Sequence, residues 1–442
     1  MTLADALLFS AGHNAAVVAL GCAAFGLAAG ALGCFVLLRG RALIADAAAH
    51  ATLPGVAGAF ILAALVGWDV RSLPLLLAGA AATAAIAVLL VNGLAAGGRI
   101  RDDAAMALVL SIGFGIGVVL MSVVQSLPVG GQAGLKSFIL GQAAGMSAAD
   151  AQFVGALAVL ALLLVGVLFR PLAALCFDRG FAAAVGLPVR ALDLALLGLM
   201  LAVTVAGLRA VGLILVVALM VIPAATARLL TERLEAMAPI AAGVGAVSAW
   251  FGAALSATLP DLPTGATITL VACALFLAAL LLAPRRGALA FAARQAMLSL
   301  TVARDHALRA AFEAAERTPE AAHSWAELGR GAGWSRWQRA LLPRWLAAAG
   351  WVRAEGGRVR LTEAGLVLAR DLTRRHRLWE HYMQAAGGLA PWAAHRAADE
   401  VEHTLPLEVA REAEAWLRRN DPARLPAEGA LPAPGETEPG PR

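Results

Sequence analysis

Between residues 14 and 284 the sequence is a succession of apolar runs separated by short polar breaks. A helix needs about 20 apolar residues to cross the hydrocarbon core of a bilayer, and most of these runs reach that length. Only 15% of the residues are charged, against about 25% in a typical soluble domain. We therefore expect a mainly α, polytopic helical bundle of about nine spans, placed at 15–38, 43–67, 73–96, 104–123, 151–169, 191–207, 210–228, 238–258 and 264–283.

Arginines mark alternate loops between these runs: Arg39, Arg41, Arg99, Arg101, Arg170, Arg179, Arg190, Arg228, Arg233, Arg285 and Arg286. The intervening loops carry only Arg71, Lys136 and Arg209. Cytoplasmic loops carry the excess of positive charge, so we expect the N-terminus outside and everything after the last span in the cytoplasm. The spans are rich in Gly and Ala, which allow helix backbones to approach closely. A tightly packed bundle of this kind is typical of a transporter or channel.

One charged pair lies inside an apolar run. The segment RALIADAAAHATLPG (41–55) opens the second expected span, and Asp46 and His50 are spaced so that they share one helix face. A carboxylate in a membrane span is costly and usually faces a cavity and a partner. Two interpretations remain open: the side chains satisfy each other as a packing pair, or they bind a cation that passes between them.

A second polar face occurs in HRAADEVEH (395–403), within the ordinary globular composition of 285–442. On a helix, His395, Asp399, Glu402 and His403 fall within an arc of about 100°. Imidazoles and carboxylates together suit a divalent metal ion. The alternative is a solvated polar face.

The apolar part resembles the permease subunits of ABC importers for manganese, zinc and iron, over about 10–285. The resemblance rests on 41–55, on VGLILVVALMVIPAATARLLTERL (211–234), on LPTGATITLV (262–271) and on FDRGFAAAVGLPVRALDLALL (177–197). It implies that Asp46 and His50 line the translocation path. It also implies that Asp178, Arg179 and Gly186 belong to a loop that docks onto a separate cytoplasmic ATPase.

The same resemblance implies a multi-pass protein of the bacterial plasma (inner) membrane that is not itself an enzyme. Its expected partners are the ATPase subunit, an extracytoplasmic metal-binding protein, and a second permease copy or a paralogue. No nucleotide site is expected in this chain, since GQAGLKS (131–137) lacks the glycine that a phosphate-binding loop needs before its lysine.

From Ser324 onward the sequence predicts a winged helix, in the order helix, turn, helix and hairpin, with AEGGRV as the tight turn. Residues 300–420 resemble the diphtheria toxin repressor and manganese repressor family, through HALRAAF (306–312), RRHRLWEHY (374–382) and HRAADEVEH. The resemblance implies a site for manganese, iron(II) or zinc, with the ligands His306, His376, Glu380, His395, Asp399, Glu402 and His403. Helix 334–351 carries four tryptophans, which favour packing or a protein interface over reading of DNA bases, so DNA is not an expected partner.

We therefore expect a permease domain at 10–285, a linker helix and winged helix at 286–365, a helical metal-binding and dimerisation region at 366–420, and a disordered tail at 421–442. The leading hypothesis is a metal-importer permease that a cytoplasmic metal sensor regulates by feedback. A membrane-anchored, metal-responsive DNA-binding regulator is the alternative. An ion-driven carrier is disfavoured by the coupling-loop resemblance at 177–190.

Overall fold

The computed structural model describes residues 3–8, 12–70, 72–96, 100–128, 143–259, 262–317, 323–327, 334–355, 358–401 and 406–426. These residues form two compact units, Met1–Phe291 and Ala292–Arg442, which we call the membrane unit and the C-terminal unit. The segment GQAGLKS (131–137), which was compared with a phosphate-binding loop, lies outside the described residues. So do Glu402, His403 and the tail from 427 onward.

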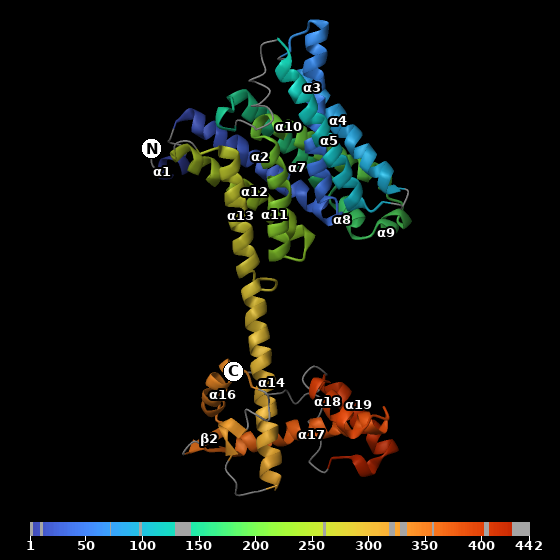
Figure 1. Cartoon of the computed structure of the whole chain (residues 1–442), viewed down its shortest axis with the longest axis vertical. Coiled ribbons are helices and arrows are strands. Elements are labelled where there is room, and N and C mark those ends of the chain that lie inside the picture. The colour runs from blue at the N-terminus through green and yellow to red at the C-terminus, as the bar shows by residue number, and fades with distance from the viewer. Residues whose placement is uncertain are drawn as a thin grey trace. The chain divides into compact units, whose positions relative to one another are not determined.

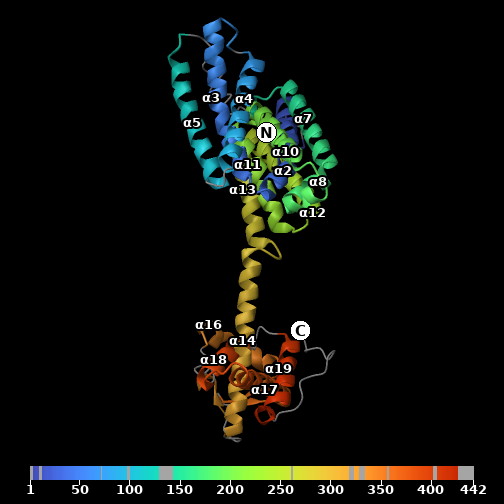
Figure 2. The ribbon, with the colours of Figure 1, turned by 90° about the vertical axis from the view of Figure 1, so that its right-hand side faces the viewer.

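The membrane unit is helical throughout its described part (Figures 1 and 2). Its elements are α1 (Leu3–Leu7), α2 (His13–Leu38), α3 (Ala42–Val66), α4 (Leu73–Ala96), α5 (Asp102–Ser126), η1 (Ala143–Gly145), α7 (Ala148–Val167), α8 (Phe169–Phe177), α9 (Arg179–Ala184), α10 (Val189–Val211), α11 (Leu213–Leu230), α12 (Leu234–Thr258) and α13 (Thr264–Leu282).

Eight of these helices are long and apolar enough to cross a membrane, which confirms the predicted polytopic bundle. The remaining expected span, 210–228, corresponds to α11, whose apolar part, Leu215–Leu230, is shorter. It is separated from α10 by Gly212 alone. Gly212 has a φ of 85°, a left-handed backbone angle that a glycine adopts without a steric penalty.

Glycines bring α2 against α12. A Cβ atom on Gly26 would overlap the backbone of Gly245, and one on Gly245 would overlap the carbonyl oxygen of Gly26. One turn away on α2, Gly30 meets the backbone of Ala241 in the same way. The two helices therefore touch backbone to backbone, as the abundance of small residues in the sequence predicted. Helices α3, α4 and α5 form a neighbouring layer, visible in Figure 2.

The C-terminal unit contains a small antiparallel sheet and several helices. Its elements are α14 (Ala288–Arg317, which begins just before the unit boundary), β1 (His323–Ser324), α16 (Arg336–Ala348), β2 (Val352–Glu355), β3 (Arg358–Leu361), α17 (Glu363–Ala385), α18 (Pro391–Val401), α19 (Leu407–Asn420) and η2 (Pro422–Arg424). The strand order is β1-β3-β2.

Local sequence explains where these elements begin. Ser335 and Gln338 form a reciprocal capping box at the start of α16. The Thr362 side chain accepts a hydrogen bond from the Gly365 amide at the start of α17. The β2–β3 hairpin follows α16, as a winged helix requires, and Leu342 and Leu346 of α16 are buried in the core.

Candidate functional site

The first candidate site is the charged pair on α3. His50 Nε2 lies 3.4 Å from Asp46 Oδ1, and the side chains are 24% and 30% exposed, respectively. The His50 ring packs edge-on against Phe114 of α5, with 5.3 Å between ring centroids. His50 Nδ1 is buried without a hydrogen-bond partner among the described residues. The pair thus presents one carboxylate and one imidazole in a largely apolar environment, and these are donors for a divalent cation.

The second candidate site is the segment around α9. The Asp178 side chain caps this helix by accepting hydrogen bonds from the backbone amides of Gly180 (2.7 Å) and Phe181 (3.1 Å). After α9 the chain reverses at Gly186, where φ is 82°. Phe177 is 96% exposed and Phe181 and Val185 are also exposed. An apolar surface of this kind on a short, well-capped helix is suited to contact with another protein.

An ionic tether behind α9 was not among the features predicted from the sequence. Asp193 on α10 pairs with Arg179 of α9 at 3.3 Å and with Arg39, just after α2, at 2.9 Å. The Asp193 and Arg39 side chains are each only 13% exposed. One carboxylate therefore connects α9 to both α2 and α10.

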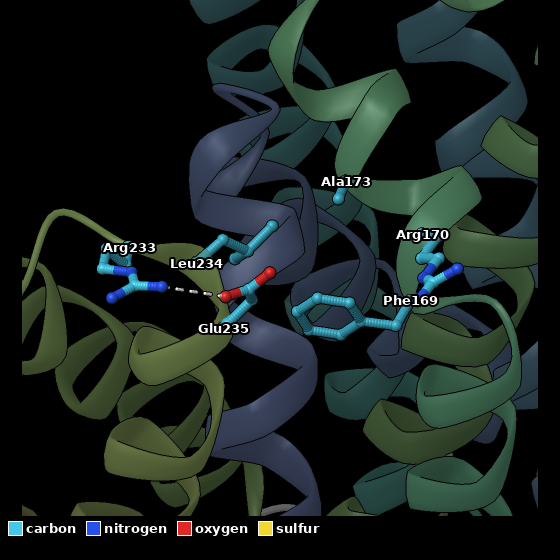
Figure 3. Close-up of a pocket in the computed structure, with 6 residues that line it drawn as sticks. All are labelled: Phe169, Arg170, Ala173, Arg233, Leu234 and Glu235. Carbon is cyan, nitrogen blue, oxygen red and sulfur yellow. Dashed lines mark ion pairs between the residues drawn. The ribbon is translucent and has the colours of Figure 1, made fainter.

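A shallow pocket of about 600 Å³ lies between α8 and the start of α12 (Figure 3). Phe169, Arg170 and Ala173 line one side, and Arg233, Leu234 and Glu235 line the other. Arg233 and Glu235 form an exposed ion pair at 3.5 Å. None of the predicted site residues lines this pocket, and we assign it no role in binding the cation.

The third candidate site lies in the C-terminal unit, where α17 and α18 bring together His376, His395 and Asp399. Potential ligand atoms of these three residues lie within 4.8 Å of one another. His376 Nε2 is 2.9 Å from His395 Nδ1, and His376 Nδ1 is 3.4 Å from Asp399 Oδ1. Glu380 Oε2 adds a fourth donor, 3.5 Å from His395 Nδ1 and 3.7 Å from His376 Nε2. Two imidazoles and two carboxylates fit manganese, iron(II) or zinc.

An arginine that the sequence did not indicate also contacts this cluster. Arg309 of α14 lies 2.6 Å from His376 Nδ1 and 2.7 Å from Asp399 Oδ1. Burial raises the pKa of Asp399, but Arg309, followed by the two histidines, lowers it, and the net pKa is below its ordinary value. Asp399 is consequently a carboxylate at neutral pH.

The structure brings together four of the seven predicted ligands: His376, Glu380, His395 and Asp399. His306 lies on α14, three residues before Arg309, and is half-buried. Glu402 and His403 lie outside the described residues, so their predicted role stays a prediction.

The tryptophans of the winged helix serve packing. Trp334 is buried and its indole N–H donates to the carbonyl of Ala303 at 3.3 Å. Trp345 packs edge-on against Trp351, and the Arg304 guanidinium lies 5.2 Å from the Trp351 ring. The sequence favoured packing or a protein interface for these side chains, and Trp334 is buried whereas Trp337 is exposed. The DNA-binding alternative is not favoured.

Eight helices that are able to cross a membrane, packed in one unit, define this part of the chain as a polytopic membrane protein. The model of the ABC 3 transport family matches residues 13–283, and the chain belongs to this family. A second family model, for the metal binding and dimerisation domain of iron dependent repressors, matches residues 362–422. This match confirms the repressor-like resemblance of the C-terminal unit.

Individual relatives agree with these assignments. The chain is 38% identical to the manganese transport system membrane protein MntC of Bacillus subtilis over 304 residues, which cover 69% of each protein. It is 37% identical to the zinc transport system membrane protein TroC of Treponema pallidum, over 62% of this chain and 90% of that protein. The solved structure of PsaBC from Streptococcus pneumoniae in complex with Fab has 28% identity and a TM-score of 0.54, covering 64% of this chain and 96% of the matched chain.

Proposed function

We propose that this chain is the permease subunit of an ATP-driven importer for a divalent transition metal: manganese, zinc or iron. The observation that carries the proposal is the Asp46–His50 pair, which offers a hard oxygen donor and an imidazole nitrogen in one partly exposed position on α3. The similarity to a manganese and a zinc transport system membrane protein supports the same cargo.

The pair supplies two donors per chain, fewer than the four or more that these cations take. A second permease chain, either a copy of this one or a paralogue, would double the number. An extracytoplasmic binding protein would deliver the cation to that site. Because a transit site must also release its cargo, two donors from each chain suit passage better than storage.

The partner ATPase would dock on the α9 segment, where Phe177 and Phe181 are exposed. Asp178, Arg179 and Gly186 shape this segment, and the Asp193 tether would pass its movement to α2 and α10. This assignment places α9 on the cytoplasmic side, in agreement with the distribution of arginines, and places the N-terminus outside.

Uptake of radioactive Mn²⁺ into proteoliposomes containing the permease and its ATPase tests the path. Asp46→Asn and His50→Ala should each abolish uptake while leaving the protein assembled, since only ligands of the passing cation are lost. Asp103→Asn is a matched control, because this exposed carboxylate on α5 pairs only loosely with Arg101, at 3.7 Å. Normal uptake by both pair variants would refute the path assignment.

We further propose that the C-terminal unit senses imported metal and lowers transport. Its supporting observation is the cluster of His376, Glu380, His395 and Asp399, on the side of the membrane where the product accumulates in this orientation. A metal ion bound there would supply a positive charge that holds α17 and α18 together. The bound metal can shift the equilibrium between the active and inhibited states only by the difference in its affinity for the two. Each tenfold difference in affinity supplies about 1.4 kcal/mol.

Vesicles preloaded with Mn²⁺ test the feedback. Uptake should be slowed in the wild type and less so in His376→Ala, because one ligand is gone. His381→Ala is the control, since His381 lies on the same helix but contacts the carbonyl of Arg424 and not the cluster. Equal sensitivity of wild type and His376→Ala to preloading would remove the sensor from the proposal and leave the permease assignment intact.

A further inference from the structure

The guanidinium of Arg309 lies against the cluster of potential metal ligands. It contacts His376 Nδ1 and Asp399 Oδ1, and both are potential ligand atoms. The Arg309 side chain is only 11% exposed, so it is held within the protein and does not extend into solvent.

The chemistry of arginine fixes the direction of these contacts. Arginine can only donate hydrogen bonds, so His376 Nδ1 accepts and the lone pair that could bind a metal is already engaged. In a neutral ring His376 Nε2 then carries the proton, and it donates to His395 Nδ1 at 2.9 Å. Arg309 thereby engages His376 and Asp399 directly and His395 through His376.

We infer that Arg309 is an internal competitor for the metal, a latch that sets how much metal the C-terminal unit needs before it responds. This inference rests on the proposed sensor role of the cluster. Arg309 must leave before His376 Nδ1 and Asp399 can serve as ligands, and hydrogen bonds to charged groups are costly to break. The affinity of the site is lower than its four donors alone would give.

A second carboxylate near Arg309 can accept hydrogen bonds from the displaced guanidinium. Glu313, one turn further along α14, has Oε1 3.7 Å from Arg309 Nε. Residues four apart on a helix are neighbours, so Arg309 can turn toward Glu313, whose side chain is 30% exposed, and there becomes more accessible to solvent. Because Arg309 is part of α14, its release also frees α14 from α17 and α18 at this point, which gives the unit two discrete arrangements.

The competing view is that Arg309 organises the cluster by holding Asp399 near the two imidazoles. Removing it would then weaken metal binding. The two views predict opposite signs for the same substitution, so one titration distinguishes them.

The test is a Mn²⁺ titration of the full-length chain in lipid nanodiscs, followed by the electron paramagnetic resonance signal of free Mn²⁺. All samples carry Asp46→Ala and His50→Ala, so that the path pair does not contribute. Arg309→Ala should bind Mn²⁺ about tenfold or more tightly than this parent. Added methylguanidinium should weaken binding to the Arg309→Ala protein and leave the parent unchanged.

Arg377→Ala is the matched control. Arg377 of α17 pairs with Glu316 of α14, so it links the same two helices through a different carboxylate. Its removal should change the dissociation constant less than twofold. An Arg309→Ala protein that binds as the parent does, or more weakly, overturns the latch but leaves the sensor site. Absence of Mn²⁺ binding in both the parent and Arg309→Ala overturns the sensor proposal and the latch with it.

A measurement on the unaltered side chain covers the case in which Arg309→Ala does not fold. Phenylglyoxal modifies accessible arginine side chains, and mass spectrometry reports the rate of modification of each arginine. Saturating Mn²⁺ should raise the rate at Arg309 severalfold in the parent and leave Arg377 unchanged. An unaltered rate at Arg309 in a chain that binds Mn²⁺ contradicts the latch.

Discussion

In the membrane unit α2 and α12 meet through the backbones of Gly26 and Gly245, whereas in the C-terminal unit α17 and α19 are joined by a buried ion pair between Arg374 and Glu414. Lipid tails are as apolar as the helices they surround, so close packing of small residues stabilises the bundle. In water, burial of larger apolar side chains supplies that stability, and charges are tolerated inside if they are paired.

The same difference applies to the two candidate metal sites. Asp46 and His50 contact each other, the His50 ring packs against Phe114, and His50 Nδ1 lacks a hydrogen-bond partner among the described residues. The cluster at His376 is surrounded by charges, with Arg309, Glu380 and Asp399 all in contact. A pair with few polar neighbours is suited to brief contact with a passing cation. A cluster whose ligands already hold other charges is suited to binding metal only above a certain concentration.

The largest expected effect comes from closing the space between α2 and α12. Gly245→Leu should abolish correct assembly, because even its Cβ would overlap the carbonyl oxygen of Gly26. Gly243→Leu, on the same helix, should be tolerated because a Cβ there meets nothing within 4 Å. Size-exclusion profiles in detergent compare the two proteins. Similar profiles would show that backbone contact between these helices is dispensable.

A second, smaller effect should follow from breaking the ion pair in the C-terminal unit. Arg374→Met should cost about 3 kcal/mol, because among the described residues the buried Glu414 keeps Arg418 alone as an ion-pair partner, at 2.9 Å. Hydrogen exchange at α17 amides in the full-length chain reports this loss. Arg370→Met, at an exposed position of the same helix, is the control. Equal protection in the two variants would mean that α17 is held by apolar packing alone.

The smallest expected effect comes from Asp193. Its ion pairs are an exception in the membrane unit, where close packing of small residues otherwise joins the helices. Asp193→Asn should lower uptake per ATP severalfold while hydrolysis continues, because Arg179 and Arg39 lose their common carboxylate. Simultaneous assays of Mn²⁺ uptake and phosphate release measure the ratio. Glu232→Gln, which disturbs the separate pair with Arg286, should leave that ratio unchanged. An unchanged ratio in Asp193→Asn would assign the tether to stability alone.

What could be predicted from the sequence was largely local. Apolar runs gave the spanning helices, and the helical repeat placed Asp46 beside His50, His376 near Glu380 and His395 near Asp399, each four residues apart. The boundary between the two spans expected within 191–228 was harder to place. Helices α10 and α11 are separated by Gly212 alone, and no polar loop marks the break.

Contacts between distant segments could not be predicted. Arg309 is 67 residues from His376, and Asp193 is 154 residues from Arg39. An arginine on an amphipathic helix ordinarily faces solvent, and only the packing of α14 against α17 and α18 directs this one into the cluster. The sequence therefore identified potential ligands and gave no sign of the cation that competes for them.

The exposed apolar side chains near α9 have a consequence for the life of the protein in the cell. Phe177, Phe181 and Val185 lie outside the buried core, on a segment that we assign to the aqueous side of the membrane. A chain synthesised in excess of its ATPase would display them uncovered, and such surfaces promote aggregation and recognition by proteases. Matched synthesis of the two subunits would then be a condition for accumulation of the permease, and surplus copies would be short-lived.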